Sequence, residues 1–298
     1  MQLKKLQTET RNKNSLNLDE LTPLGIIKLM NQEDKQVAYH VEKELESISI
    51  VIEKTIEQLR KGGRLIYCGA GTSGRIAVLD AVECPPTFGF DPKRVIALLA
   101  GSDHGYAKEE AEDSYELGQE DLKRNHVSSE DILIGIAASG RTPYVIGALD
   151  YAKGKGAVTV AFSCNKSSEI SKHADYQIEV ENGPEILTGS TRLKAGTSQK
   201  MVLNMITTAS MISLGKVYEN LMVDVEASNE KLVERWKHIV MEATDCEYAQ
   251  ASEYYHLAHM NAKIAIVMIL NQVDYESARR SLDMMDGSVK KVLAQGAK

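Results

Sequence analysis

Apolar and polar residues follow one another along this chain in blocks that change character twice. Residues 1–20 are polar and predict an extended arm. From about Leu24 to Leu59, apolar residues recur at helical spacing with Glu and Lys between them, which predicts helix. Short, nearly continuous apolar runs then alternate with helical segments, and after Val225 only helical patterns remain.

The middle block predicts a parallel sheet. Its strand-like runs are Arg64–Cys68, Val95–Ala100, Ile132–Ala137, Val158–Ser163 and Tyr176–Val180. Helices are expected between them at about 73–81, 106–123 and 143–152, and a long helix follows at about 191–217. Short apolar strands separated by helices are typical of an α/β fold, here a doubly wound five-stranded parallel sheet buried on both faces.

The last block predicts helices at about 226–244, 246–259, 262–270, 274–284 and 288–294, separated by Asn, Asp and Gly. The last four make a small helical bundle of about 50 residues, which we expect to pack on the main domain or on a partner subunit because so small a core is marginal alone. The predicted division is therefore an arm (1–20), an α/β domain with its N-terminal helices (21–225) and a C-terminal helical region (226–298).

Composition limits the classes of function. The chain has 298 residues, of which 43% are hydrophobic and 26% charged, and its net charge of −7 comes without a basic block. A nucleic-acid or anionic-membrane surface is therefore not expected. No apolar run reaches the roughly 18 residues of a membrane span, and the N-terminal segment lacks the apolar stretch of a signal peptide.

Cysteines and histidines add little chemistry. Four cysteines are scattered without a C-x-x-C pair, which favours reduced thiols in a cytoplasmic protein; they are Cys68, Cys84, Cys164 and Cys246. His256 and His259 can share a helix face, but no thiols or placed carboxylates accompany them. We therefore expect no metal site.

Two turns stand out as candidate anion sites. One runs from Gly69 through Gly71, Thr72 and Ser73 to Arg75, and it follows the first predicted strand. The other follows the third strand and consists of Ala138, Ser139, Gly140, Arg141, Thr142 and Pro143. Each places backbone N–H groups, hydroxyls and the positive end of a helix dipole at one point, which suits a phosphate. Two such turns in one sheet suggest a phosphorylated small molecule.

Two other interpretations of the first turn remain. Gly69, Gly71 and Gly74 also fit the dinucleotide pattern G-x-G-x-x-G, but the acidic residue expected about 20 positions later is missing, since Asp103 comes too late. A purely structural glycine turn is the other, and it leaves Thr72 and Ser73 unexplained.

Three further features are candidates for chemistry. Glu83 precedes two prolines, directly after the predicted helix 73–81, and a carboxylate held in place suits acid or base catalysis, although it can equally cap a turn. Glu112 lies in an acidic run whose default interpretation is a solvated helix face. Residues 183–197 collect hydroxyls and charges at the start of the long predicted helix, where a ligand can approach, although the two basic side chains can also be surface charges. The candidates are Glu185, Ser190, Arg192 and Lys194.

Together, GAGTSGR (69–75), ECPPTFG (83–89), AASGRTPY (137–144), GPEILTGSTRLKAGT (183–197) and NLMVDV (220–225) resemble the N-acetylmuramic acid 6-phosphate etherases, which have the sugar isomerase (SIS) fold. The resemblance runs from about Leu21 into the C-terminal helices. It implies a cytoplasmic bacterial enzyme, usually a homodimer, that needs no metal or nicotinamide. The implied reaction releases D-lactate from N-acetylmuramic acid 6-phosphate and leaves N-acetylglucosamine 6-phosphate.

The resemblance also implies roles. Glu83 matches the residue that protonates the departing lactate, and Glu112 matches the second catalytic acid, expected to act as a base. Two alternatives stay open: a phosphosugar sensor without chemistry, in which neither carboxylate matters, and an aldose–ketose isomerase, which shares C2 deprotonation but releases nothing. Lactate release separates all three.

Overall fold

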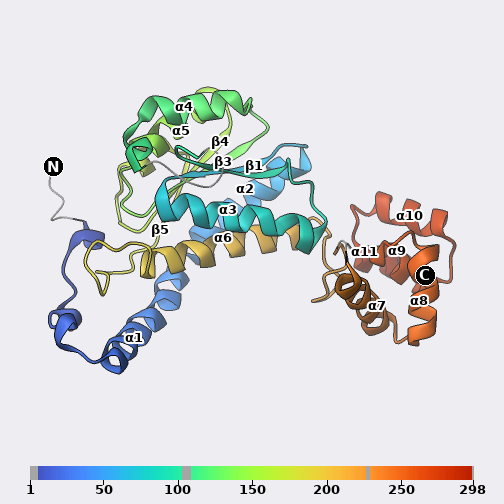
Figure 1. The fold of residues 1–298 in the computed structure, drawn as a ribbon. Coiled ribbons are helices and arrows are strands. Elements are labelled where there is room, and N and C mark those ends of the chain that lie inside the picture. The colour runs from blue at the N-terminus through green and yellow to red at the C-terminus, as the bar shows by residue number, and fades with distance from the viewer. Residues whose placement is uncertain (1–5, 103–108, 226–228, 297–298) are drawn as a thin grey trace. The chain divides into compact units, whose positions relative to one another are not determined.

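The computed structural model describes residues 6–102, 109–225 and 229–296 (Figure 1). The chain forms two compact units, one of Met1–Ala81 with Lys93–Thr207 and the other of Val82–Pro92 with Thr208–Lys298. Helices α3 (Gly71–Phe88) and α6 (Lys194–Ser213) each begin in the first unit and end in the second. The division after residues 20 and 225 that the sequence suggests stays a prediction.

The first unit is built on a five-stranded sheet in which every neighbouring pair is parallel. The strands are β1 (Leu65–Gly69), β2 (Val95–Leu99), β3 (Ile132–Ala137), β4 (Val158–Ser163) and β5 (Tyr176–Glu179). They match the five predicted runs to within a residue at each end. The doubly wound α/β fold is therefore confirmed.

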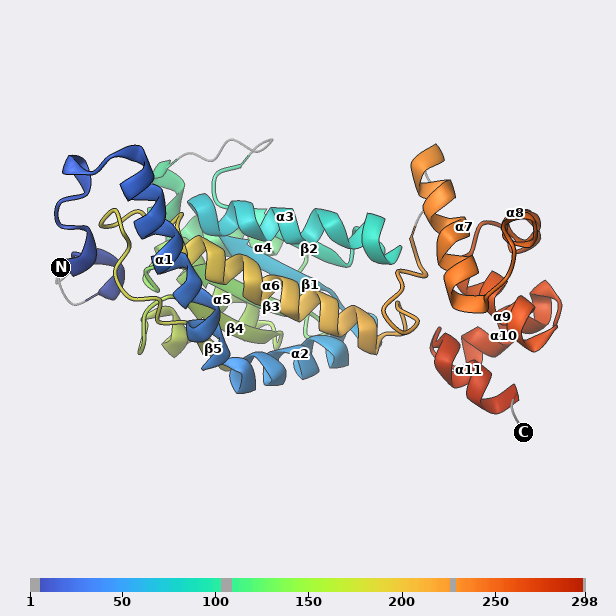
Figure 2. The same ribbon diagram turned by 90° about the horizontal axis from the view of Figure 1, so that it is seen from below.

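Helices cover both faces of the sheet, as Figures 1 and 2 show from two sides. One face is covered by α4 (Tyr115–Arg124) and α5 (Pro143–Gly154). The other is covered by α2 (Leu45–Arg60) and by the parts of α3 and α6 that belong to the first unit. All residues of β1 and β3 are buried, which is why these strands read as continuous apolar runs.

The strand order is β2-β1-β3-β4-β5. After β1 the chain turns to one side to form β2, and then crosses to the other side of β1 to form β3. The connection that follows β1 and the connection that follows β3 therefore run in opposite directions across the sheet. Open α/β sheets bind their ligands at such a switch point, outside the carboxyl ends of the strands. The turns that follow β1 and β3 flank this point.

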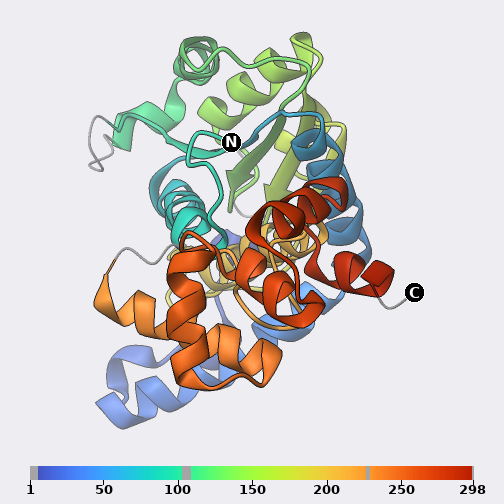
Figure 3. The same ribbon diagram turned by 90° about the vertical axis from the view of Figure 1, so that its right-hand side faces the viewer.

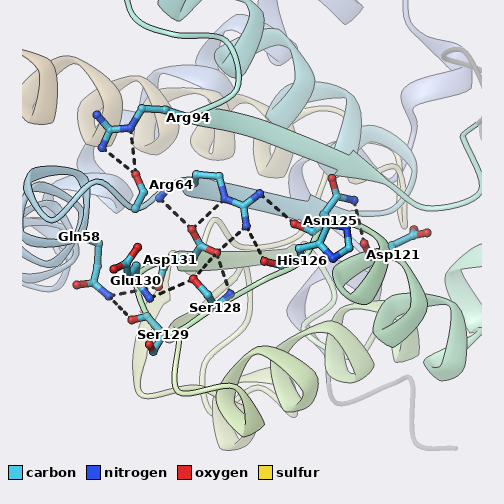
Figure 4. A network of polar contacts seen from close by, with 11 residues as sticks. Gln58, Arg64, Arg94, Asp121, Asn125, His126, Ser128, Ser129, Glu130 and Asp131 are labelled. Carbon is cyan, nitrogen blue, oxygen red and sulfur yellow. Dashed lines mark hydrogen bonds and ion pairs between the residues drawn. The ribbon is translucent and has the colours of Figure 1, made fainter.

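The opposite edge of the sheet is fixed by an ion pair (Figure 4). The Arg64 guanidinium places Nη2 2.7 Å from Oδ2 of Asp131, whose side chain is 2% exposed, and Nε donates to Oδ1 at 3.0 Å. Burial alone raises the pKa of Asp131, but the bonds from Arg64 and Ser128 outweigh it and hold that pKa below its usual value. This contact joins the amino ends of β1 and β3, away from the turns.

Several helix limits differ from the prediction. The stretch 24–59 is two helices, α1 (Pro23–Glu42) and α2, which are separated at Lys43 and Glu44. The expected helix 106–123 is a short 3-10 helix, η5 (Glu109–Asp113), followed by α4; positions 106–108 lie outside the described residues. The long helix α6 spans Lys194–Ser213, within the expected 191–217.

Helix α3 continues past its predicted end at Ala81 to Phe88, so the helix includes Pro85 and Pro86. Prolines lack the N–H that would bond to the carbonyl four residues earlier, here those of Ala81 and Val82. The interruption in backbone bonding therefore falls where the chain passes from the first unit to the second. Both prolines stand in the last turn of α3, which ends at Phe88.

The N-terminal segment is not the extended arm that its polar sequence predicts. Its described residues form the 3-10 turns η2 (Gln7–Glu9), η3 (Lys13–Ser15) and η4 (Leu18–Glu20). Thr8 and Asn12 are buried, at 3% and 6% exposure. Asn12 Nδ2 donates to Oε2 of Glu33 at 2.9 Å, and Ser15 Oγ donates to the carbonyl of Ile186 at 2.7 Å. Polar side chains of this segment form hydrogen bonds with specific partners, so several of them are buried although the sequence is polar.

The second unit contains α7 (Glu230–Thr244), α8 (Tyr248–Leu257), α9 (Ala262–Asn271), α10 (Tyr275–Met284) and α11 (Val289–Gly296), coloured orange to red in Figure 3. Helix α9 is apolar and almost fully buried, so it forms the centre of this core. Trp236 packs there and donates Nε1–H to the carbonyl of Met260 at 2.9 Å. Asp224 accepts ion pairs from Lys216 at 3.0 Å and Lys263 at 2.7 Å.

Candidate active site

The first turn joins β1 to α3. Strand β1 ends at Gly69 and α3 begins at Gly71, whose φ of +52° suits glycine. A Cβ on Gly74 would lie 2.5 Å from the carbonyl oxygen of Gly69, so only glycine lets the helix start this close to the strand. The first N–H groups of α3 have no partner within the helix, and they carry the positive end of its dipole.

The second turn joins β3 to α5. Gly140 has a φ of +71°, and a Cβ there would lie 2.4 Å from Cβ of Ser168. Thr142 is the N-cap of α5 and Pro143 the first helical residue, yet the Thr142 side chain makes no capping hydrogen bond. That hydroxyl is therefore not used to cap the helix and can serve a ligand.

The sheet brings the two turns together. Strands β1 and β3 are neighbours in parallel register, with Gly69 opposite Ile136, so the turns begin side by side at the switch point. Ser73 is 7% exposed, and Thr72, Ser139, Arg141 and Thr142 are partly exposed. The arrangement that the sequence suggests, two hydroxyl-bearing helix starts at one edge, is present.

Two buried donor groups accompany the turns. In the described part of the chain, Nη1 of Arg141 and Nε2 of Gln199 are shielded from solvent and have no hydrogen-bond partner. Gln199 lies on α6 and is fully buried, and its Oε1 accepts a hydrogen bond from Ser73 Oγ at 3.1 Å. Unpaired buried donors are rare in proteins, so each group favours a further acceptor, which for Arg141 at this edge can be a phosphate.

A polar cluster supports the second turn from behind. Asn165 is 3% exposed, and its Nδ2 donates to the carbonyls of Ala138 at 3.1 Å and Ser139 at 3.3 Å. Its Oδ1 accepts the backbone N–H of Gln7 at 2.9 Å. One side chain thus joins the N-terminal segment to the second turn.

Glu179, at the end of β5, holds the adjacent loop. Its carboxylate accepts the N–H groups of Ser167 at 2.8 Å and Ser168 at 2.9 Å, and the Ser171 hydroxyl at 2.6 Å. This fixes Ser168 against Gly140. Sequence reasoning missed Asn165, Glu179 and Gln199; the first two carry a usable signal, since they are polar residues at or just past a strand's carboxyl end.

Glu185 and Lys194 have structural partners. Glu185 is 1% exposed and accepts the N–H groups of Lys194 at 3.0 Å and Ala195 at 2.9 Å, so it caps α6. Burial raises the pKa of Glu185, and these two N–H groups oppose that rise. Lys194 Nζ lies 2.7 Å from Oε2 of Glu33, so the interpretation of Lys194 as a surface charge is wrong. Ser190 is partly exposed and Arg192 is exposed.

Comparison with known proteins decides the family. A profile described as the glucokinase regulatory protein N-terminal SIS domain matches residues 47–153, and the SIS domain profile matches residues 105–209. Proteins named N-acetylmuramic acid 6-phosphate etherase, from Bacillus cereus (strain G9842) and Geobacillus sp. (strain WCH70), are 57% identical over 293 residues, 98% of this chain and 100% and 99% of theirs. This chain belongs to the N-acetylmuramic acid 6-phosphate etherases. The family that the sequence motifs suggest is therefore confirmed.

Among solved structures, a phosphoheptose isomerase from Francisella tularensis is similar over 64% of this chain and 100% of its own, at 15% identity and a TM-score of 0.49. The SIS profiles agree with the sheet described above. Both turns lie within residues 47–153, the part matched by the first profile.

The two carboxylates that the etherase motifs single out lie on different elements. Glu83 is exposed, and it lies inside α3 rather than after a helix as the sequence suggests, because the helix continues to Phe88. Glu112 is exposed on η5, a 3-10 helix rather than a long solvated helix face. Glu83 belongs to the second unit and Glu112 to the first.

The remaining candidates in this etherase give little chemistry. His256 lies in the last turn of α8, but His259 lies beyond its end with a φ of +49°, so the two do not share a helix face. Among the described residues, no group of three His, Cys, Asp or Glu side chains is placed to hold a metal ion. The four cysteines, all of them in the described ranges, form no disulfide. Within the same ranges, no helix is long and apolar enough to cross a membrane.

Proposed function

We propose that this chain is a carbon–oxygen lyase that cleaves the D-lactyl ether of N-acetylmuramic acid 6-phosphate, giving N-acetylglucosamine 6-phosphate and D-lactate. The observation that carries the proposal is the 57% identity, over nearly the whole length, to proteins named for this activity. The two adjacent turns at the switch point supply what a phosphorylated sugar needs, and they support the same conclusion.

The 6-phosphate binds between the two turns. Ser73, Ser139 and Thr142 donate their hydroxyls, and the N-termini of α3 and α5 contribute N–H groups and positive dipole ends. Arg141 offers a buried Nη1 that is unpaired within the described residues. Ser190, Arg192, Glu185 and Lys194 remain candidate contacts for the sugar. Glu185 and Lys194 also support the segment that carries the other two.

The chemistry follows from the substrate. An ether oxygen leaves poorly, so the ring first opens to the aldehyde, which acidifies the proton at C2. A base removes this proton, and the electron pair of the broken C2–H bond forms the C2–C3 double bond. The C3–oxygen bond breaks at the same time, as an acid protonates the departing lactate. Water then adds a hydroxyl at C3 and a proton at C2. The net reaction consumes one water and neither oxidises nor reduces the sugar.

Two carboxylates can supply this acid and base. Glu112 is the proposed base at C2 and Glu83 the proposed acid at the lactyl oxygen. Both side chains are exposed, so a substrate can reach them.

We further propose a homodimer that works in the cytoplasm, where thiols stay reduced, in the recycling of cell-wall amino sugars. Helix α1 exposes Leu24, Ile27 and Tyr39 at 57%, 58% and 61%, an apolar surface that a second copy can cover. Leu24→Asp with Ile27→Asp is expected to shift the sedimentation coefficient from dimer to monomer at micromolar concentration. An unchanged value in the folded variant argues against this surface.

The deciding experiment measures lactate released from N-acetylmuramic acid 6-phosphate and from the same sugar without phosphate. Release only from the phosphorylated sugar is expected. Exchange of the C2 hydrogen with solvent but no lactate indicates an aldose–ketose isomerase, and tight binding without either reaction indicates a sensor.

A further inference from the structure

Gln199 lies beside the first turn and accepts a hydrogen bond from the Ser73 hydroxyl. Ser73 Oγ donates its hydrogen to Gln199 Oε1 at 3.1 Å, and both residues belong to the first unit. Gln199 is fully buried and Ser73 is 7% exposed, so little water reaches this bond. Among the described residues, Gln199 Nε2 is buried and has no partner.

Close packing of α6 on α3 holds the pair together. A Cβ on Gly196 would lie 3.4 Å from Cδ1 of Ile76 and 3.6 Å from Cγ2 of Thr72, so the two helices are in contact at this level. Gln199 is three residues after Gly196 and therefore lies on the same face of α6, directed at α3. The two ends of an amide are nearly the same size, so its oxygen and nitrogen can exchange places within the same volume.

The direction of one hydrogen matters for binding a phosphate. A serine hydroxyl has a single hydrogen, whereas ionised phosphate oxygens act chiefly as acceptors. While the hydrogen of Ser73 points to Gln199 Oε1, Ser73 cannot donate to a phosphate. With the amide turned by half a rotation, Nε2 donates to Ser73 Oγ, the unpaired donor gains a partner, and the Ser73 hydrogen is free for the ligand.

We propose that Gln199 is a positioning residue that directs the Ser73 hydroxyl toward the phosphate of the substrate. In the bound state Gln199 Nε2 donates to Ser73 Oγ, and Ser73 Oγ donates to a phosphate oxygen. The inference rests on the proposed function in one respect, the binding of a phosphate at Ser73. It explains why a fully buried helix position carries an amide rather than an apolar residue.

Gln199→Met and Gln199→Glu test the proposal, each alone and combined with Ser73→Ala. Methionine keeps the length of the side chain and removes the donor; glutamate keeps an acceptor and removes the donor when ionised. Ser198→Ala is the matched control, because Ser198 is also buried on α6 but contacts Asn182 and the carbonyl of Ala195. Melting temperatures confirm that each variant is folded.

The readouts are KM and kcat for N-acetylmuramic acid 6-phosphate and the affinity for inorganic phosphate by calorimetry. Gln199→Met is expected to raise KM and weaken phosphate binding about three- to tenfold with kcat within about twofold, the range for one hydrogen bond. Gln199→Glu should raise KM and weaken phosphate binding more than Gln199→Met does at pH 8. Its difference from the parent enzyme should become smaller at pH 5.5, since the introduced carboxyl group can donate a hydrogen bond once it is protonated. Ser198→Ala should leave both values unchanged.

The Ser73→Ala background separates positioning from packing. With no hydroxyl to direct, Gln199→Met is expected to cause no further loss. Equal losses in both backgrounds, or unchanged phosphate affinity in the folded Gln199 variants, overturn the proposal. If the enzyme releases no lactate but phosphate binding shows the expected coupling, the role of Gln199 stands and the proposed reaction fails.

Discussion

Lys194 Nζ lies 2.7 Å from Oε2 of Glu33, and the two side chains are only 4% and 13% exposed. The pair joins the start of α6 to α1. Burial acts to raise the pKa of Glu33, but hydrogen bonds from Lys194 and Asn14 outweigh it and hold that pKa below its usual value. Asn12 donates to the same carboxylate at 2.9 Å, so Glu33 has partners besides Lys194.

The two halves of this pair are expected to be unequal in their effect on stability. Glu33→Gln removes the ion-pair partner of the buried Lys194 ammonium and should lower the free energy of unfolding by about 3 kcal/mol. Lys194→Met leaves Glu33 with its two asparagines and should cost about 1 kcal/mol. Urea denaturation measures both. Lys172→Met, which breaks an exposed pair with Glu169, is the control and should change little. A greater loss for Lys194→Met contradicts this account.

Much of the fold could be predicted because the relevant signals are local. Each buried strand is one uninterrupted apolar run, and both anion turns follow their strands directly in sequence. The pairing of Lys194 with Glu33 is different, since these residues are 161 positions apart and meet only once α1 has packed. The break between α1 and α2 was hidden because apolar spacing continues across it. Gln199 looks like any polar residue in a helix until its burial is known.

The helix that contains Glu83 shows a second limit of prediction from sequence. Pro85 and Pro86 predict an end to the helix, and the backbone bonds that they remove are indeed lost. The helix nevertheless continues to Phe88, and Gly89 closes it with an N–H to the carbonyl of Pro85 at 2.8 Å. The two prolines correctly locate the interruption in backbone hydrogen bonding, but the end of the helix that the sequence predicts, at Ala81, is wrong.

Asp80 is expected to make stability depend on pH. Burial raises its pKa from 3.8 to about 6, although hydrogen bonds from Tyr67 and Thr207 oppose the rise. The folded state therefore binds a proton more tightly than the unfolded state. Stability from this group is fully present below pH 3.8 and is lost as pH rises to about 6, by about 3 kcal/mol in all.

Asp80→Asn should remove this fall. Comparing the free energy of unfolding at pH 4.5 and pH 7.5 in both proteins isolates the contribution of Asp80, because other titrating groups cancel. Tyr67→Phe deletes the donor 3.0 Å from Oδ2 of Asp80 and should move the fall to higher pH. An identical pH profile for parent and Asp80→Asn shows that Asp80 is already ionised in the folded state below pH 4.5.

Ser73, Ser139 and Thr142 are expected to bind the phosphate. Replacing Ser73 or Ser139 with Ala, or Thr142 with Val, should each weaken substrate binding by about 1–3 kcal/mol, the range for a hydrogen bond to a charged group. The unphosphorylated sugar should bind poorly to the parent and equally poorly to the variants. Calorimetric titration with both sugars gives the comparison. Equal affinity of the parent for the two sugars removes the assignment.

Substitutions of the two proposed catalytic carboxylates, Glu83 and Glu112, are expected to block different steps of the reaction. Glu83→Gln keeps the shape of the side chain but cannot donate an acid proton, so it should stop lactate release while the C2 hydrogen still exchanges with solvent. Glu112→Gln removes the base and should stop exchange as well. Each change should lower the rate of lactate release at least about 100-fold with little effect on binding, as expected for a general acid or base.

Deuterium uptake at C2 and lactate release are followed together in D₂O. Glu116→Gln serves as the control, since Glu116 is an exposed carboxylate in the first turn of α4 with no proposed role. Exchange without lactate in the Glu83 variant and neither in the Glu112 variant identifies acid and base separately. Parent-rate exchange in the Glu112 variant places the base elsewhere, and normal lactate release in the Glu83 variant means that another group protonates the leaving oxygen.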